Sequence, residues 1–301
     1  MDKNKIEKLR KNISIKYILI IISVILLIST ILVIIFTDYN MKSLLIICAL
    51  FIIIISILLL SMRNEYPTYV SSFKKVYVFN ALKKKFTNLY YNGKGMPSSV
   101  IWATHMLDMG DIYLSNDLIS GKYKKTDFMQ ADVRIRKVET VVDSEGNVSE
   151  NIRDYFYGKW LVFDFNKKFK YNVQVRERNF NHAIVSNDRS KYGYKEVKME
   201  DERFNRVFKI YTENEHDAFY ILTPQMQQRI LKIRDIIKGD LLLCFINNEL
   251  HIGINNHSDS FEPKIFKKEH EIEEYINKDI EVITNFIDEL DLDNDLFRKE
   301  V

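Results

Sequence analysis

The sequence predicts an α+β protein in which an N-terminal transmembrane helical hairpin precedes a cytosolic domain of mainly antiparallel strands with several helices. Three observations lead to this prediction: two long uncharged apolar runs near the N-terminus, short segments that alternate apolar and polar residues, and helical periodicity with capping signals towards the C-terminus. We expect four parts: a basic cytoplasmic N-terminus (1–16), the transmembrane hairpin (17–62), a juxtamembrane helix and linker (63–97), and the cytosolic α+β domain (98–301).

The two apolar runs cover residues 17–36 and 43–62, and each has twenty residues without Asp, Glu, Lys, Arg or His. A helix of this length is about 30 Å long, which matches the hydrocarbon core of a bilayer. Two core helices of a soluble protein are the alternative, but such helices rarely stay uncharged over this length. Because an ion path or proton relay normally needs an ionisable group, we expect an anchor, with a homo-oligomeric pore as the alternative.

Basic residues flank the outer ends of both runs and predict their orientation. They are Lys3, Lys5, Lys8, Arg10, Lys11 and Lys16 before the first run, and Arg63, Lys74, Lys75, Lys83, Lys84 and Lys85 after the second. The six-residue connection (37–42) carries only Lys42, beside Asp38. We therefore expect both termini in the cytoplasm and the hairpin in the cell (inner) membrane. A cleaved signal peptide is disfavoured because the first run is too long and a second follows directly.

The composition excludes several classes of protein. The chain of 301 residues has 44 Lys and Arg against 41 Asp and Glu, so its net charge of +3 lacks the basic excess typical of a nucleic-acid binder. With 47% hydrophobic residues the chain can form a real core. Two cysteines are too few for a disulfide framework or a cysteine-based zinc site.

Between the hairpin and the sheet we expect a helix that begins at Pro67 and ends before Gly93. Its lysines either lie on anionic lipid or are simply solvated while the helix packs on the domain. A short helix is expected over residues 98–109. Strands are expected over 133–136 and 153–165, joined as an antiparallel hairpin with a bulge near Lys137 and Val138, and over 171–178 and 206–212.

The C-terminal third has the clearest local signals. Thr223 and Pro224 predict a helix start, Gly239 a left-handed helix cap, and the apolar stripe between them one buried helix face. Residues 241–246 predict a buried strand, Asn247 and Asn248 a tight turn into a returning strand, and the apolar periodicity over 268–290 a last helix.

Several short segments in this order resemble the bacterial family called domain of unknown function 3137. They are Gly158-Lys159-Trp160-Leu161-Val162-Phe163-Asp164-Phe165, Tyr220-Ile221-Leu222-Thr223-Pro224, the Asn247-Asn248 hairpin, Gly121-Lys122-Tyr123 and Phe261-Glu262-Pro263. The resemblance covers roughly residues 65–295, and two N-terminal spans are also usual in that family. It implies a membrane-anchored cytosolic α+β domain. It implies no chemistry, because the family has no established activity to carry over.

One set of residues predicts a ligand site. These are Arg134, Arg136, Arg176 and Arg178 with Tyr155, Tyr157 and Trp160, which would line a pocket for a phosphorylated ligand. The alternative is that arginines alternating on a half-exposed sheet need no ligand. His251, His257 and Asp259 are weak metal candidates, because scattered histidines more often lie at the surface or form hydrogen bonds. We therefore expect no metal or cofactor. Cys244, in an apolar strand, is interpreted as an inert core thiol.

Three functions are compatible with these features. We favour a non-enzymatic, membrane-anchored binding or scaffold module, with the lipid bilayer and another membrane protein or a second copy of the chain as partners, and no nucleic acid. The alternative is a ligand-sensing effector whose hairpin oligomerises to perturb the membrane. A membrane-bound hydrolase with a dispersed site comes last, since no catalytic motif is evident.

Overall fold

The computed structural model describes residues 3–36, 41–142, 146, 148–165, 170–180 and 193–294. The chain divides into two compact units, which are Met1–Ala81 with Phe261–Asn277, and Leu82–Ser260 with Lys278–Val301. The first unit contains the long apolar helices, and the second contains an antiparallel sheet with helices. The predicted α+β class with an N-terminal pair of candidate spans is therefore confirmed. Residues 143–147, which lie between the two strands of the expected hairpin, are largely outside the described residues.

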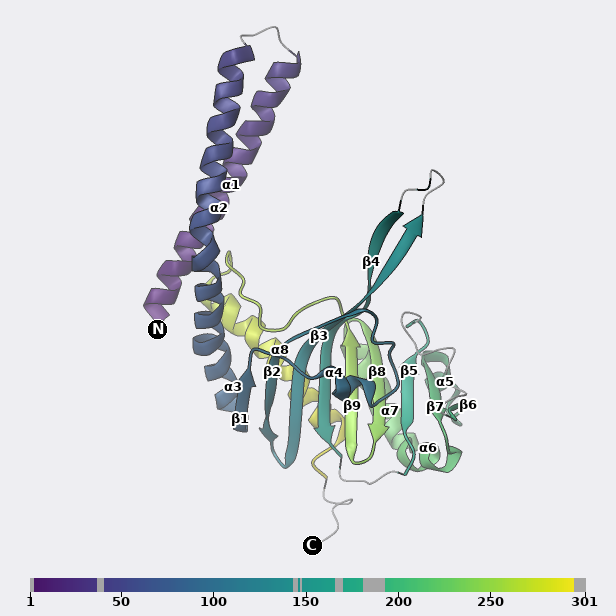
Figure 1. Cartoon of the computed structure of the whole chain (residues 1–301). Coiled ribbons are helices and arrows are strands. Elements are labelled where there is room, and N and C mark those ends of the chain that lie inside the picture. Colours follow the sequence, from purple (N-terminus) through teal and green to yellow (C-terminus); the bar gives the residue numbers. More distant parts are fainter. Residues whose placement is uncertain are drawn as a thin grey trace. The chain divides into compact units, whose positions relative to one another are not determined.

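In the first unit, helices α1 (Lys3–Phe36) and α2 (Met41–Phe73) lie side by side (Figure 1). Both are long and apolar enough to cross a membrane by length and composition. Met41 and Lys42, expected in the connection, belong to α2. The helix start expected at Pro67 is wrong, because Pro67 lies inside α2. Proline cannot donate the backbone hydrogen bond of a helix interior. The helix nevertheless continues past it, and the buried rings of Tyr69 and Phe73 follow at helical spacing, 6.1 Å apart.

Helix α2 continues as a π-helical turn, η1 (Lys74–Val78), and then as α3 (Phe79–Lys85). In the described part of the second unit one sheet has nine strands in the order β1-β2-β3-β4-β9-β8-β5-β7-β6, and all neighbours pair antiparallel. The strands are β1 (Thr87–Asn92), β2 (Ile112–Tyr123), β3 (Thr126–Val142), β4 (Val148–Asp164), β5 (Val173–Glu177), β6 (Lys195–Val197), β7 (Phe208–Thr212), β8 (Asp240–Ile246) and β9 (Glu249–Asn255). The helices that follow α3 are α4 (Ser98–Trp102), α5 (Glu202–Val207), α6 (Glu215–Ile221), α7 (Pro224–Ile236) and α8 (Glu269–Leu290).

Both predicted hairpins are present, β3 with β4 and β8 with β9. The register shift between β3 and β4 falls between Ile135 and Arg136, slightly before the expected bulge. At the turn between β8 and β9, Asn247 adopts a positive φ of 56°, a conformation that asparagine tolerates. The predicted helix start is also confirmed, because the Thr223 hydroxyl accepts a hydrogen bond from the Met226 N–H at 3.3 Å.

Several other predicted boundaries are wrong. The helix expected to end before Gly93 ends at Lys85, and Thr87–Asn92 form the strand β1 instead. Helix α4 ends at Trp102 instead of Met109. The strand expected over 206–212 begins at Phe208. Arg206 and Val207 belong instead to the preceding helix α5, which the Asp201 side chain caps. Gly239 does not cap α7, since the helix ends at Ile236 and Ile237 is already extended. Gly239 instead lies in the following loop with a φ of 101°, where a Cβ would be 2.5 Å from the Asn255 carbonyl oxygen.

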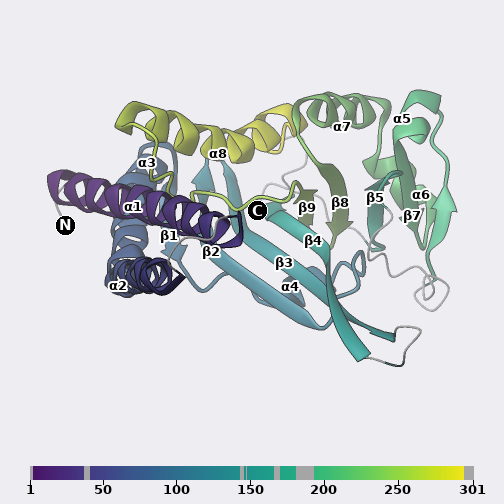
Figure 2. The same cartoon turned by 90° about the horizontal axis from the view of Figure 1, so that it is seen from above.

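The sheet of the second unit separates two layers. Helix α4 lies on one face, where Ile101 packs in a cluster with Trp160 and Phe156. Helix α7 and residues 278–290 of α8 cover the other face (Figure 2). There the rings of Phe163 and Phe286 lie 6.1 Å apart. Burial on both faces explains the continuous apolar run of β8.

Candidate functional site

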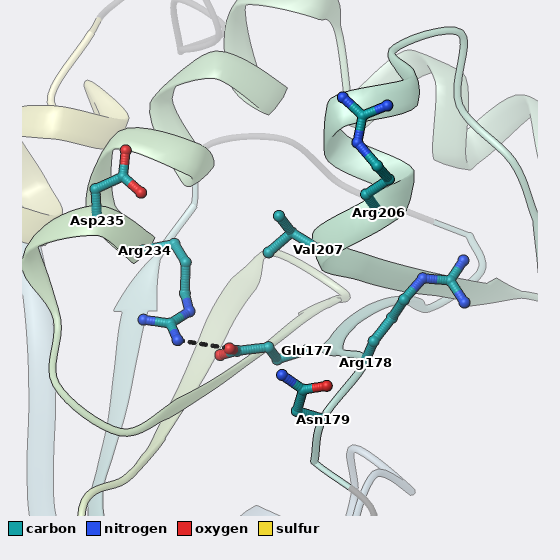
Figure 3. A pocket seen from close by; sticks show the side chains of 7 residues that line it. All are labelled: Glu177, Arg178, Asn179, Arg206, Val207, Arg234 and Asp235. Carbon is teal, nitrogen blue, oxygen red and sulfur yellow. Dashed lines mark ion pairs between the residues drawn. The ribbon is translucent and has the colours of Figure 1, made fainter.

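A cavity of about 430 Å³ in the second unit is the candidate site. It lies where the end of β5 meets α5 and α7 (Figure 3). Its lining residues are Glu177, Arg178, Asn179, Arg206, Val207, Arg234 and Asp235. Three guanidinium groups and two carboxylates therefore share this cavity, which we call the arginine pocket.

One arginine of the pocket is held by a buried carboxylate. Arg234 Nη2 lies 2.6 Å from Glu177 Oε1, and the Glu177 side chain is only 5% exposed. The second oxygen of Glu177 accepts the Leu241 N–H at 2.9 Å, and Arg234 also donates to the Ile237 carbonyl at 3.2 Å. These bonds fix the Arg234 guanidinium on one wall and largely neutralise its charge.

The other two arginines lie on the opposite side of the pocket in Figure 3. The Arg178 Nε donates to the Asn205 carbonyl at 2.6 Å, which positions the side chain through one nitrogen. Among the residues that the structure describes, its two terminal nitrogens form no ion pair or hydrogen bond. Within the described ranges, the one ion pair of Arg206 is a long one of 3.8 Å with Glu202, and both side chains are strongly exposed. Arg178 and Arg206 are therefore available to an anion, since guanidinium groups bind phosphate or carboxylate in a fork geometry.

The described lining of the pocket offers groups that can bind a ligand. Its seven described residues include no serine, cysteine, histidine or lysine. The asparagine and the exposed Asp235 add polar contacts, and Asp235 lies 3.5 Å from Arg203 outside the lining. The arginine and amide side chains of this described lining can bind a small anion.

The seven residues predicted to bind a ligand fall in four places. Arg134 forms two hydrogen bonds of 2.8 Å with the Asp154 carboxylate, and Arg136 adds a third at 3.2 Å. The Arg134 guanidinium lies 4.4 Å from the centre of the Tyr157 ring. The bonds from Arg134 hold the pKa of Asp154 below its usual value. Asp154 was not predicted from the sequence, although the pairing of β3 with β4 places it directly opposite Arg136.

The remaining predicted residues lie apart from that cluster. Arg176 is buried, donates to the Gln174 side chain, and lies 5.2 Å from the centre of the Tyr211 ring. Trp160 is fully buried in the core, and the half-buried Tyr155 packs against the same core cluster. Of the seven residues only Arg178 lines the arginine pocket. Ligand binding by the set remains a prediction.

A buried polar cluster in the second unit was not predicted from the sequence. Asp132 accepts hydrogen bonds from the Ser260 N–H and hydroxyl, and Lys159 forms an ion pair with Asp279. Burial is the main cause that raises the pKa of Asp132 to about 7. In the sequence, the one sign of this cluster is Asp132 itself, an acidic residue in a stretch of β3 that otherwise faces inward. Because the cluster is buried, we interpret it as structural.

The weak metal candidates have other contacts. The buried His251 ring lies 3.4 Å from Trp160 Nε1 and 3.2 Å from Glu249, and the His257 ring lies beside Tyr157. In the part of the chain that the structure describes, no three His, Cys, Asp or Glu side chains are grouped to hold a metal ion. Cys244 is buried, and burial raises the pKa of its thiol to about 12, which agrees with the predicted core role.

Part of the chain is similar to a known protein family. Residues 154–292 match the family model described as "Protein of unknown function (DUF3137)". This segment includes four of the five motifs noted in the sequence, and Gly121-Lys122-Tyr123 lies outside it. No curated protein matches the chain. The crystal structure of the mycobacterial trehalose monomycolate transport factor A, TtfA, is similar at 9% identity and a TM-score of 0.38, over 76% of this chain and 97% of that one. A likeness this low supports no argument about function.

Proposed function

We propose that this chain, which belongs through residues 154–292 to the DUF3137 family of unknown function, is a membrane-anchored binding or scaffold module. One observation carries the proposal. The apolar side chains along α1 and α2 are largely exposed in the folded chain, as in Ile25, Ile35 and Leu60. Core helices of a soluble protein would bury such residues, whereas a bilayer solvates them.

The proposed orientation has both termini in the cytoplasm and the hairpin in the inner membrane. The polar side chains at one end of the helix pair support it, because Lys16 and Glu65 pair at 2.7 Å directly outside the two apolar runs. The basic residues before the first run and after the second lie at this same end, which the positive-inside rule assigns to the cytoplasm. The module would then present its α+β domain to another membrane protein or to a second copy of the chain.

Extraction and proteolysis test this proposal. Full-length chain in bacterial membranes should stay in the pellet after alkaline carbonate washing and enter the supernatant only with detergent. In spheroplasts, protease added outside should leave the C-terminal domain intact, and lysis should make it accessible. Release by carbonate would contradict the anchor, and digestion in intact spheroplasts would contradict the orientation.

The arginine pocket favours a second candidate, a ligand-sensing effector that binds a small anion. Arg178 and Arg206 would provide the contacts, while Arg234 is already paired with Glu177. Inorganic phosphate should then raise the Tm of the detergent-solubilised chain, and the double variant Arg178→Ala/Arg206→Ala should lose that shift. Lys238→Ala is the control, because Lys238 is an exposed basic residue that is not among the lining residues. An equal shift in all three proteins would contradict anion binding there.

A further inference from the structure

A short basic loop in the first unit combines exposed lysines with an exposed aromatic ring. It consists of residues 264–268, Lys264-Ile265-Phe266-Lys267-Lys268, directly before α8. The three lysines are exposed, and Phe266 is 64% exposed. The Lys267 N–H donates to the Lys264 carbonyl at 3.1 Å, which closes a turn with Phe266 at its tip. Aromatic rings flanked by basic side chains are typical of segments at the boundary between lipid and water.

Arg10 of α1 holds this loop in place. Its Nη1 donates to the carbonyls of Ile265 and Lys267, each at 2.7 Å. These two carbonyls flank Phe266, so the backbone is fixed on both sides of the exposed ring. Glu7 holds the same guanidinium through Nε at 2.8 Å and through Nη2 at 2.5 Å. The exposure of Phe266 is therefore a property of a fixed loop.

The loop lies at the depth where the apolar runs begin. The Phe266 ring is 6.3 Å from the Tyr17 ring in an edge-to-face arrangement, and Tyr17 is the first residue of the first uncharged run. Lys16 precedes it and pairs with Glu65, just beyond the end of the second run. Tyr17 and Phe266 thus lie beside the last charged groups before the apolar region, where an aromatic belt is expected.

The charges around the loop leave its lysines available. Glu269, the nearest acidic residue along the chain, pairs with Lys3 at 3.1 Å. Lys264 lies 5.1 Å over the Tyr275 ring, and the Glu271 carboxylate accepts the Lys268 backbone N–H at 2.7 Å. No ion pair of Lys264, Lys267 or Lys268 is present among the described residues. An anionic surface would therefore meet three accessible ammonium groups around one apolar ring.

We infer that the basic loop is a second membrane contact, in which Phe266 inserts among the headgroups of the bilayer and Lys264, Lys267 and Lys268 bind anionic lipid. The inference rests on the proposed membrane anchoring of α1 and α2. It assigns the loop one partner, a lipid surface carrying negative charge. Arg10 acts as a positioning residue, because it fixes the loop without providing a lipid contact of its own.

Fluorescence quenching in vesicles tests the insertion. Full-length Phe266→Trp is reconstituted into anionic vesicles with bromines placed high on the acyl chains, and the emission of Trp102 and Trp160 is subtracted using the wild-type chain. We expect the added emission to fall about twofold or more relative to unbrominated vesicles. Phe219→Trp, at an exposed phenylalanine of α6, is the control and should show no such loss. If the Phe266→Trp chains float with the vesicles but their added emission is unquenched, the membrane contact of the loop is overturned and the anchor stands. If the chains fail to float, both the anchor and the membrane contact of the loop are overturned.

A second comparison tests the lysines. In the Phe266→Trp background, Lys264→Gln/Lys267→Gln/Lys268→Gln should reduce the quenching in anionic vesicles to the level seen in neutral vesicles. The same change of charge at Lys83, Lys84 and Lys85, which are exposed on α3, is the matched control and should leave quenching unchanged. Equal loss in both triple variants, or no loss in the first, would show that the loop does not recognise anionic lipid. Arg10→Met should weaken the quenching because the clamp on Ile265 and Lys267 is lost.

Discussion

Asp132 on β3 accepts two hydrogen bonds from Ser260, one from the backbone N–H at 2.8 Å and one from the hydroxyl at 2.7 Å. The carboxyl group is almost completely buried, and this burial is the main cause that raises its pKa to about 7. The bonds from Ser260 and the charge of Lys159 act in the opposite direction and favour the ionised form. A buried acid that titrates near neutral pH links the stability of the second unit to pH.

The sign of this linkage follows from the two pKa values. Between the ordinary pKa of 3.8 and about 7, the folded chain binds a proton that the unfolded chain releases. The contribution of Asp132 to stability is therefore fully present at low pH and is lost as the pH rises through about 7, by up to about 4 kcal/mol. Asp132→Asn keeps an acceptor for Ser260 and cannot ionise. Its Tm, measured by circular dichroism in detergent from pH 5 to 8, should fall less steeply than that of the wild type.

Ser260→Ala provides the matching change in the opposite direction. It removes the hydroxyl that stabilises the charged carboxylate, so the pKa of Asp132 should rise further and the loss of stability should extend to higher pH. If the Tm values of wild type, Asp132→Asn and Ser260→Ala run parallel over this pH range, Asp132 does not titrate there.

The buried ion pair between Lys159 on β4 and Asp279 on α8 gives a second prediction. The side chains are only 4% and 13% exposed. Lys159→Met leaves the carboxylate of Asp279 in a buried site without this cation, which should cost about 3 kcal/mol. Lys159→Met/Asp279→Leu removes both charges and should recover most of that loss.

Urea unfolding of the single variants, the double variant and the wild type measures this coupling. The experiment is best done at pH 5, where Asp132 holds its proton and its interaction with Lys159 does not complicate the cycle. Losses that simply add in the double variant would mean that Lys159 and Asp279 contribute independently.

Two glycines with similar backbone angles should respond very differently to alanine. Gly95 has a φ of 79°, and a Cβ there would lie 2.3 Å from the backbone carbon of Ser115. Gly146 has a φ of 83°, and no atom of the described residues lies within 4 Å of such a Cβ. Gly146→Ala should therefore cost only the strain of the left-handed conformation, about 1–2 kcal/mol. Gly95→Ala adds a collision with backbone and should lower the Tm much further. Equal Tm changes in the two variants would contradict the close approach at Gly95.

The sequence predicted those parts of the fold whose signals are local. The helix α7 carries its own cap at Thr223, and the strands β8 and β9 are joined by a turn with its own signal in Asn247 and Asn248. Strand β2 was missed because its register shifts between Asn116 and Ile119, which interrupts the alternation that marks a strand. Strand β6 has only three residues, too few for a pattern.

The candidate site was harder to predict because its residues are brought together by pairing between distant segments. The Arg178 side chain was named in advance, but its neighbours Arg206 and Arg234 belong to helices on other segments of the chain. Likewise, Arg134 faces Asp154 only after β3 and β4 are aligned with the correct register shift. The sequence gives only the spacing of the arginines. Which of them lie beside a carboxylate depends on how the distant segments pair in the fold.

The thiol of Cys244 gives the last prediction. Burial raises its pKa to about 12, so at pH 8 only about one thiol in ten thousand is the reactive thiolate, and the surrounding core excludes reagents as well. Cys48→Ser leaves Cys244 as the single cysteine of the chain. In detergent at pH 8 this variant should react very slowly with a thiol-specific chromogenic reagent, and should react completely once the chain is unfolded in guanidinium chloride. Labelling in the native state faster than unfolding would mean that β8 opens locally, which contradicts its burial on both faces of the sheet.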